Sequence, residues 1–413
     1  MFDFLLSEEG MRIRDEARDL VKWVPRQMII DMDQDKIRFP KEFLREAGRR
    51  NLMGCRYPRK WGGRDLDWVT TCAVMEEVGT LGYIFACTFG VGAELVCDAI
   101  VLHGTDEQKE KYVKPLLKGE IFAAECLTEP RGGSDFFGTT TTAEDKGDHF
   151  VINGQKRFIV GAEGADYFLV YAKTDLDAKP REALTCLIVD RGPGVETTYL
   201  YGLMGCRGGG AGRLVFKDVK VPKENVVGKI NGAYDVFNTM MIPERLGTAA
   251  MTIGSARPAV DVATGYTTRR KAFGTTINNF EGVSFQVAEA AMLLDASRSM
   301  IYTTARAVDT GQDPRRIRRM VSESKKFVTE SCQKAANNAM QVMGGIGYTT
   351  VFPVERIVRD LRLASIWTGS NEIMSLIIAN EWYREYFKKK GHDIRNYEGD
   401  AEEADAPDEK IYE

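Results

Sequence analysis

The spacing of apolar residues divides the chain into three long segments. From residue 1 to about residue 124 apolar positions recur at helical intervals, as in EFLREAGRRNLMG, where Phe43, Leu44 and Ala47 share one face of a helix. We therefore predict an N-terminal domain over residues 1–124 that is built from several amphipathic helices.

The period changes to two between about residues 125 and 235. HFVINGQKRFIV contains two apolar runs joined by Asn153 and Gly154, a dipeptide typical of a tight β-hairpin. The runs YFLVYAKTD, ALTCLIVDRGPGV and RLVFKDVKVP alternate in the same way, with Gly and Pro at the turns. This pattern predicts an antiparallel, barrel-like β domain over residues 125–235.

Helical periodicity returns at about residue 236 and continues towards the end of the chain. Apolar residues at i, i+3, i+4 and i+7 in AEAAMLLDASRSMIYTTARAV and SESKKFVTESCQKAANNAMQVMG predict a C-terminal four-helix bundle over 236–392. We predict that residues 393–413 are an acidic tail. The order of helices, strands and helices predicts an α+β fold and disfavours an alternating Rossmann sheet.

Composition and charge exclude several classes of protein. Hydrophobic residues make up 44% of the chain and charged residues 28%, as in packed, water-soluble domains. The net charge of −4 gives no wide basic face, so nucleic acid is not an expected partner. The longest uncharged stretch, residues 78–93, is too short and too rich in glycine for a membrane span. The first twenty residues lack the pattern of a signal peptide.

The cysteines and histidines give no sign of a metal site. Eight cysteines are scattered without CxxC spacing, which predicts buried thiols and a cytoplasmic protein. Three histidines lie far apart, so neither a metal centre nor a Ser-His-Asp hydrolase is expected.

Five strings occur in an order that resembles the acyl-CoA dehydrogenase family. They are CLTEPRGGSD (126–135), NGQKRFIVGAEGADYFLV (153–170), RRKAFGTTINNFEGVSFQVAEAAM (269–292), QVMGGIGYTTVFPVERIVRD (341–360) and WTGSNEIM (367–374). The resemblance implies FAD bound between the β domain and the C-terminal bundle, with an acyl-CoA thioester against the flavin. It also implies electron-transferring flavoprotein as the oxidant and a homotetramer.

The resemblance assigns cofactor contacts to the first two strings. It places Leu127 and Thr128 at the flavin, with the Thr128 hydroxyl on the pyrimidine edge, and Ser134 at a phosphate and beside the substrate. Phe158 keeps the aromatic ring of KRFIVG, but Val160 stands where the family usually has a hydroxyl that bonds flavin N5. Val160 is either a lost cofactor contact or a strand residue that packs.

The same resemblance assigns further cofactor contacts near the C-terminus. Arg270, Phe273, Gln341 and Gly345 would hold the adenine nucleotide half of FAD across a subunit boundary, and Ser370 would also contact the cofactor. A guanidinium suits a pyrophosphate because its planar fork matches the oxygens. Without the resemblance, Arg270 would be interpreted as a surface salt-bridge residue.

The catalytic base is predicted from one missing and one gained acid. Most relatives carry a glutamate just before the glycine of a Tyr-Glu-Gly-Thr string, where this chain has Thr368. The long-chain and isovaleryl-CoA enzymes instead carry it before an arginine, as in Pro243-Glu244-Arg245-Leu246 here. We therefore predict Glu244 as the base, with a pKa raised by burial. The alternative is an acid in the first turn of a helix, beneath the helix dipole.

Three further residues are assigned to the substrate. The backbone amide of Thr368 would stabilise the thioester oxyanion, and Arg245 would bind the substrate. Glu94, in FACTFGVGAELVCD, would line the acyl pocket, either as a second acid acting at a remote carbon or as a rim residue.

The predicted activity is α,β-dehydrogenation of a long, branched or cyclic acyl-CoA. Glu244 would take the α-proton while flavin N5 takes the β-hydride. The alternatives are elimination at a remote carbon, enoyl-CoA reduction, oxidation by oxygen, and a flavin-free acyl-CoA binder or structural subunit.

Overall fold

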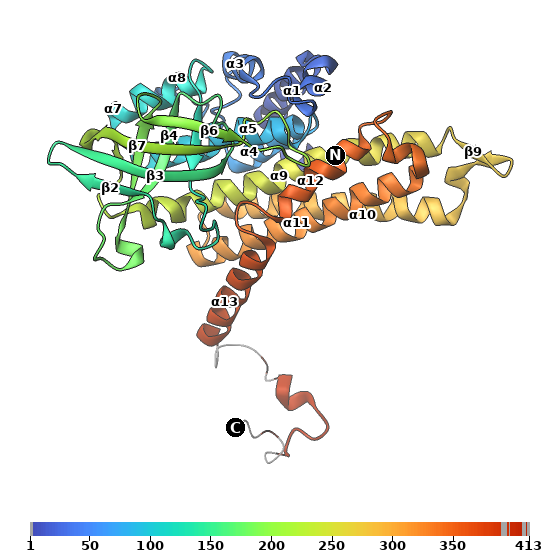
Figure 1. The fold of residues 1–413 in the computed structure, drawn as a ribbon. Coiled ribbons are helices and arrows are strands. Elements are labelled where there is room, and N and C mark those ends of the chain that lie inside the picture. Colours follow the sequence, from blue (N-terminus) through green and yellow to red (C-terminus); the bar gives the residue numbers. More distant parts are fainter. Residues whose placement is uncertain (1–2, 390–394, 396, 407–409, 411–413) are drawn as a thin grey trace.

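The computed structural model describes residues 3–389, 395, 397–406 and 410. Along the chain, helices are followed by strands and then by helices again, which confirms the predicted α+β architecture (Figure 1). The long C-terminal helices run beneath both the sheet and the N-terminal helices, so all three parts meet along one of them, α9.

Short helices form the N-terminal part. They are α1 (Glu8–Trp23), α2 (Arg26–Asp33), α3 (Lys41–Arg49), α4 (Trp68–Gly79), α5 (Tyr83–Gly90), α6 (Cys97–His103), α7 (Asp106–Gln108) and α8 (Lys114–Leu117). Helix α4 is buried along most of its length and packs against α9 (Ala233–Thr267). A Cβ added at Gly254 of α9 would lie 2.0 Å from the Glu76 carbonyl oxygen, so glycine lets these helices approach closely.

One stretch of the N-terminal part is long and apolar enough to cross a membrane. It is Tyr83–His103, where a π-helical segment, Val91–Val96, joins α5 to α6. Of its most apolar window, 83% is buried inside the protein. This run therefore has the environment of a core helix, and no second candidate lies in the described residues.

The β part is a single sheet in the order β6-β7-β3-β2-β4-β5-β8. Its strands are β1 (Ala123–Cys126), β2 (Thr142–Asp145), β3 (His149–Ile159), β4 (Tyr167–Lys173), β5 (Leu184–Asp190), β6 (Val195–Leu200), β7 (Gly212–Pro222) and β8 (Val226–Val227). Most pairs are antiparallel as predicted, but β1 runs parallel to β4, and β2 meets β4 in parallel at one residue pair. The sheet is therefore mixed.

The predicted hairpin at Asn153 and Gly154 is wrong. Both residues lie inside the continuous strand β3, where the pairing with β7 shifts register between Ile152 and Gly154. Gly154 has a φ of +150°, and Asn153 exchanges two hydrogen bonds with Asp218 on β7. The dipeptide thus produces a β-bulge, because the long partner strand continues past it.

Helices α9, α10 (Glu281–Asp309) and α11 (Pro314–Met343) lie side by side over most of their length (Figure 1). Helix α12 (Val354–Leu361) packs on α9 and α11, and α13 (Asn371–Lys389) packs on α11. The strands β9 (Lys271–Ala272) and β10 (Thr275–Thr276) form a small hairpin at the far tip of the α9–α10 pair.

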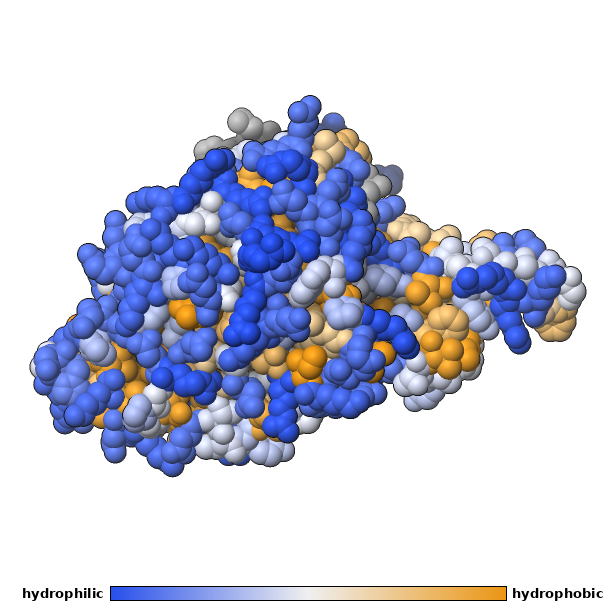
Figure 2. Space-filling model, turned by 90° about the horizontal axis from the view of Figure 1, so that it is seen from above, coloured by the Kyte–Doolittle hydropathy of each residue, from blue (hydrophilic) through white to orange (hydrophobic). Residues whose placement is uncertain are grey.

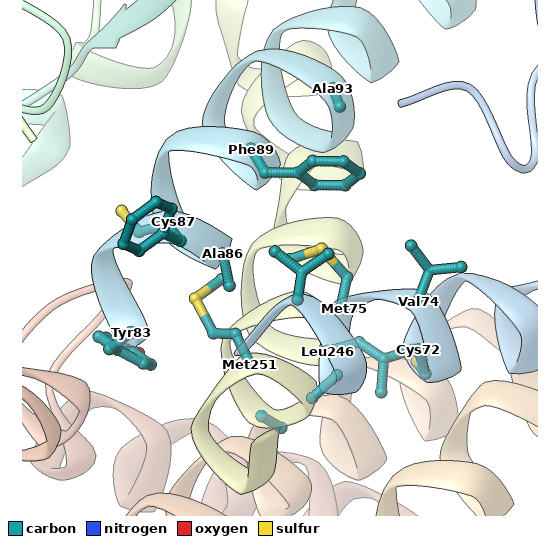
Figure 3. Packing of buried hydrophobic residues seen from close by; sticks show 14 of the residues in the cluster. Cys72, Val74, Met75, Tyr83, Ala86, Cys87, Phe89, Ala93, Leu246 and Met251 are labelled. Carbon is teal, nitrogen blue, oxygen red and sulfur yellow. The ribbon is translucent and has the colours of Figure 1, made fainter. Parts of the chain in front are cut away.

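The surface seen from above is mainly hydrophilic, with scattered apolar groups that continue onto the projecting arm (Figure 2). All eight cysteines are buried and unbridged, as predicted. The core is continuous between the N-terminal helices and α9, where Met75, Cys87, Leu246 and Met251 gather around one packed region (Figure 3).

Candidate active site

A cavity of about 570 Å³ lies where the N-terminal helices, the sheet and α9 meet. Met75 of α4, Cys87 of α5 and Met251 of α9 form part of its apolar wall. Ten of the residues predicted from the sequence line it: Glu94, Leu127, Thr128, Ser134, Phe158, Val160, Glu244, Arg245, Thr368 and Ser370. A volume of this size is typical of small-molecule sites.

The loop after β1 is held in place by a buried acid. Glu129 accepts hydrogen bonds from the backbone amides of Thr140 and Thr141 and from the Lys156 ammonium, at 2.6, 3.0 and 2.9 Å. These partners lower the pKa of Glu129 to about 2 despite its burial. The ionised carboxylate fixes the loop that presents Thr128 and Ser134 to the cavity.

Phe158 and Val160 enter the cavity from the end of β3. Phe158 has a φ of +58° and is 48% exposed as a residue, and its ring contacts that of Tyr201 at a centroid distance of 4.6 Å. The backbone amide of Arg157 donates to the Thr128 carbonyl at 2.9 Å, which joins the end of β3 to the loop after β1. A left-handed backbone at a phenylalanine costs conformational free energy, and such positions are typical of functional sites. The exposed ring is therefore a candidate ligand contact.

Thr368 lies in a short loop between α12 and α13. It has a φ of +55°, and the structure gives no hydrogen-bond partner to its backbone amide within the described residues. The ammonium of Lys325 on α11 donates to the Gly369 carbonyl at 2.8 Å and to Asn371 Oδ1 at 2.9 Å. Lys325 therefore anchors the loop, and the Thr368 amide remains available to a ligand.

Glu244 lies in the interior of α9, eleven residues after its start at Ala233. The alternative of an acid in a helical first turn is therefore wrong. Burial raises the pKa of Glu244 to about 7, against the opposing effect of the Arg245 and Lys325 cations. Arg245 itself donates to Ser322 Oγ at 3.1 Å, and burial lowers its pKa to about 10.

Glu94 lies on the π-helical segment and is held by an arginine from a distant loop. Arg56 donates to the Glu94 carboxylate at 2.8–2.9 Å and also pairs with Asp98. Burial raises the pKa of Glu94 to about 7, although the Arg56 charge opposes the rise. Glu94 thus reaches the cavity with its carboxylate already paired.

Glu125 is a cavity residue that we did not predict. It lies on β1 and shares the cavity with Glu244. Burial and then the Glu244 charge raise the pKa of Glu125 to about 8. The sequence carried one signal, a lone acid within the otherwise uncharged run from Ile121 to Thr128.

Four predicted cofactor residues lie outside this cavity. Arg270 and Phe273 are at the exposed β9–β10 hairpin, where Phe273 is 96% exposed. Gln341 and Gly345 are exposed at the end of α11. The structure does not bring these four to the cavity of their own chain, and their role across a subunit boundary stays a prediction.

The residues present fit a planar, hydrogen-bonding ring such as a flavin. The Arg157 Nε atom is buried and has no partner in the described part of the chain. Arg157 lines the cavity together with Phe158, Thr128 and Thr368, and the Thr368 backbone amide has no partner among the described residues. Unused donors and an aromatic face together suit a cofactor with both a π-face and acceptor atoms.

Comparison with known proteins gives the same family over all three parts of the chain. Residues 7–120 match the acyl-CoA dehydrogenase N-terminal domain, residues 124–219 the middle domain and residues 231–382 the C-terminal domain.

Individual relatives cover almost the whole chain. The caffeyl-CoA reductase–Etf complex subunit CarC of Acetobacterium woodii is 33% identical over 90% of this chain and 98% of its own. The 3-(aryl)acrylate reductase of Clostridium sporogenes is 32% identical over 91% and 98%. The structure of butyryl-CoA dehydrogenase from Megasphaera elsdenii superposes with a TM-score of 0.88 at 28% identity, over 92% and 99%.

Proposed function

Because the chain belongs to the acyl-CoA dehydrogenase family, whose members are FAD-dependent oxidoreductases, we propose that it dehydrogenates an acyl-CoA thioester with Glu244 as the base. The observation that carries the proposal is the position of Glu244. Glu244 lies in the interior of α9 and lines the same cavity as Thr368, the residue that stands where most family members have the base.

The chain itself supplies three parts of the reaction. The Glu244 carboxylate takes the α-proton, the Thr368 amide donates to the thioester oxygen as negative charge develops there, and the apolar wall excludes water. Bound FAD would supply the acceptor for the β-hydride and its two electrons, so that the product is an enoyl-CoA. Thr128, Ser134, Phe158 and Ser370 would hold the cofactor.

A second candidate is the reverse reaction, reduction of an enoyl-CoA. Two of the relatives are named as reductases. A pKa of about 7 makes Glu244 as able to return a proton to the α-carbon as to remove one. The two directions use the same residues, so the electron donor or acceptor decides between them.

The partners are part of the same proposal. The relative from Acetobacterium woodii is named as a subunit of a complex with Etf, which supports an electron-transferring flavoprotein as the redox partner here. We also propose a homotetramer, because the exposed residues Arg270 and Phe273 would reach a cofactor only in a neighbouring chain. A cytoplasmic location is proposed as well, since it would keep the unbridged thiols reduced.

An anaerobic absorbance titration tests the function. The purified protein is titrated with straight, branched, cyclic and aromatic acyl-CoA thioesters while the band of oxidised flavin is followed. Bleaching by one class, lost in Glu244→Gln, supports dehydrogenation and gives the substrate class. If no saturated thioester bleaches the flavin, but an enoyl-CoA re-oxidises protein whose flavin was first reduced by a dye, the reductase is supported. A colourless protein that takes up no FAD contradicts both.

A further inference from the structure

Glu125 occupies a position where a strand residue points away from the core of the sheet. Its neighbours Ala124 and Cys126 are fully buried on the opposite face, within the core of the β part. Glu125 pairs with Leu169 across β1 and β4, and on this face its carboxyl reaches the cavity. The alternation of the strand therefore aims one carboxyl at the substrate space.

The surroundings of this carboxyl are mostly apolar. Phe136 stacks on Phe237 at a centroid distance of 4.1 Å and packs edge-on against Tyr171, and both phenylalanines line the cavity beside Glu125. Tyr171 is buried, and its hydroxyl donates to Glu125 Oε1 at 3.3 Å, which is a long hydrogen bond.

The nearby cations are engaged elsewhere. Lys156 donates to Glu129 and to the Leu127 carbonyl, and Arg245 donates to Ser322 and to Met241 Sδ. The single hydrogen bond from Tyr171 is therefore what the described residues give to Glu125. The carboxyl keeps hydrogen-bonding capacity that only water or a ligand can use.

A hydrocarbon chain and a polar chain would have opposite effects at this position. A hydrocarbon that fills the cavity displaces the water and leaves the buried carboxyl with only its long hydrogen bond from Tyr171, which is unfavourable. An acyl chain with a hydroxyl or carbonyl group replaces the lost hydrogen bonds. Glu94 does not have this effect, because its carboxylate is already paired with Arg56.

We propose that Glu125 is a specificity-determining residue, which selects acyl groups that carry a hydroxyl or carbonyl over plain hydrocarbon chains of the same length. The inference rests on the proposed function, since it concerns the acyl group of the CoA thioester. Glu244 acts at the α-carbon, whereas Glu125 recognises a polar group elsewhere on the chain.

The test uses unreactive CoA thioethers, in which a methylene replaces the thioester carbonyl, so that binding is measured apart from catalysis. Isothermal titration calorimetry compares hexyl-CoA with hexyl-CoA analogues hydroxylated at C3, C4, C5 or C6. In the wild type we expect at least one hydroxylated analogue to bind about 10- to 100-fold tighter than hexyl-CoA. In Glu125→Leu this advantage should vanish, while hexyl-CoA binds at least as tightly as before.

Two variants serve as controls. Glu125→Gln keeps a donor and an acceptor and should retain most of the preference. Glu144→Leu removes an exposed acid from β2, beside Lys146, and should leave both affinities unchanged. Thermal unfolding of each variant checks that the fold is intact.

The outcomes separate this inference from the function on which it rests. If hexyl-CoA binds and acyl-CoA bleaches the flavin, but no hydroxylated analogue is preferred, only the role of Glu125 is refuted. A preference that persists in Glu125→Leu refutes it equally. If no thioether binds and no thioester bleaches the flavin, the proposed function fails and the inference fails with it.

Discussion

The pH dependence of the reaction tests Glu244 most directly. The base acts when ionised, and its pKa is raised from an ordinary value near 4.5 to about 7. About one tenth of the molecules would then hold it ionised at pH 6 and about nine tenths at pH 8. We expect kcat/KM to rise about tenfold over this interval, with the loss on the acidic side.

The groups around Glu244 determine in which direction its pKa shifts and at which pH it ionises. Burial favours the protonated form, and ionised Glu125 would favour it further, while the Arg245 and Lys325 cations favour the ionised form. Tyr171, whose pKa is raised by burial and by both acids, stays neutral throughout this range. Burial also raises the pKa of Glu125 to about 8 and that of Glu94 to about 7, so both titrate in the same range. The comparison of Glu244→Gln with Glu125→Gln decides whether the fall in kcat/KM at acidic pH belongs to Glu244.

The assay measures kcat/KM between pH 5.5 and 8.5 with a dye as electron acceptor. Glu244→Gln should lower the rate by about 10² to 10⁴-fold, which is the usual contribution of a general base. Glu125→Gln is the matched control and should keep the acidic limb. A flat wild-type profile between pH 6 and 8, or a Glu244→Gln rate close to that of the wild type, would refute the assignment.

Three other variants probe the cavity and its support. Lys325→Met removes a cation that favours ionised Glu244, so the acidic limb should move to higher pH, whereas a purely structural role would change the rate without moving the limb. Glu76→Ala breaks a buried ion pair with Arg298 at 2.7 Å and should cost about 3–5 kcal/mol of unfolding free energy in a denaturant titration. Gly254→Ala places a Cβ 2.0 Å from the Glu76 carbonyl oxygen, so the thermal midpoint should fall, by an amount equivalent to about 1–3 kcal/mol.

Local patterns predicted the fold well because each segment has a clear period. They failed where a distant partner decides the structure. Asn153 and Gly154 favour a turn by themselves, but the long strand β7 pairs on both sides of them and converts the turn signal into a bulge. Strand β1 has four residues, too few for its alternation to show that Glu125 faces the cavity.

Site residues could be predicted where they belong to a sequence motif. They could not be predicted where they depend on contacts between segments that are distant in the sequence. Ten predicted residues line one cavity, although Glu94 and Ser370 lie far apart in sequence. The pairing of Glu94 with Arg56 could not be foreseen, because the arginine lies 38 residues earlier in a loop without helical or strand periodicity. Tertiary contacts of this kind depend on the packed fold and leave no local signature.

The length of α9 has a consequence for the stability of the holoenzyme. From Glu244 to the last residue, Thr267, the helix has 267 − 244 = 23 steps, or about 35 Å along its axis. Arg270 and Phe273 lie beyond that end. If they bind a cofactor, it is therefore the cofactor of another copy of the chain. Dilution that separates the copies would then release flavin while leaving the acyl pocket of each chain intact, and cofactor retention would depend on protein concentration.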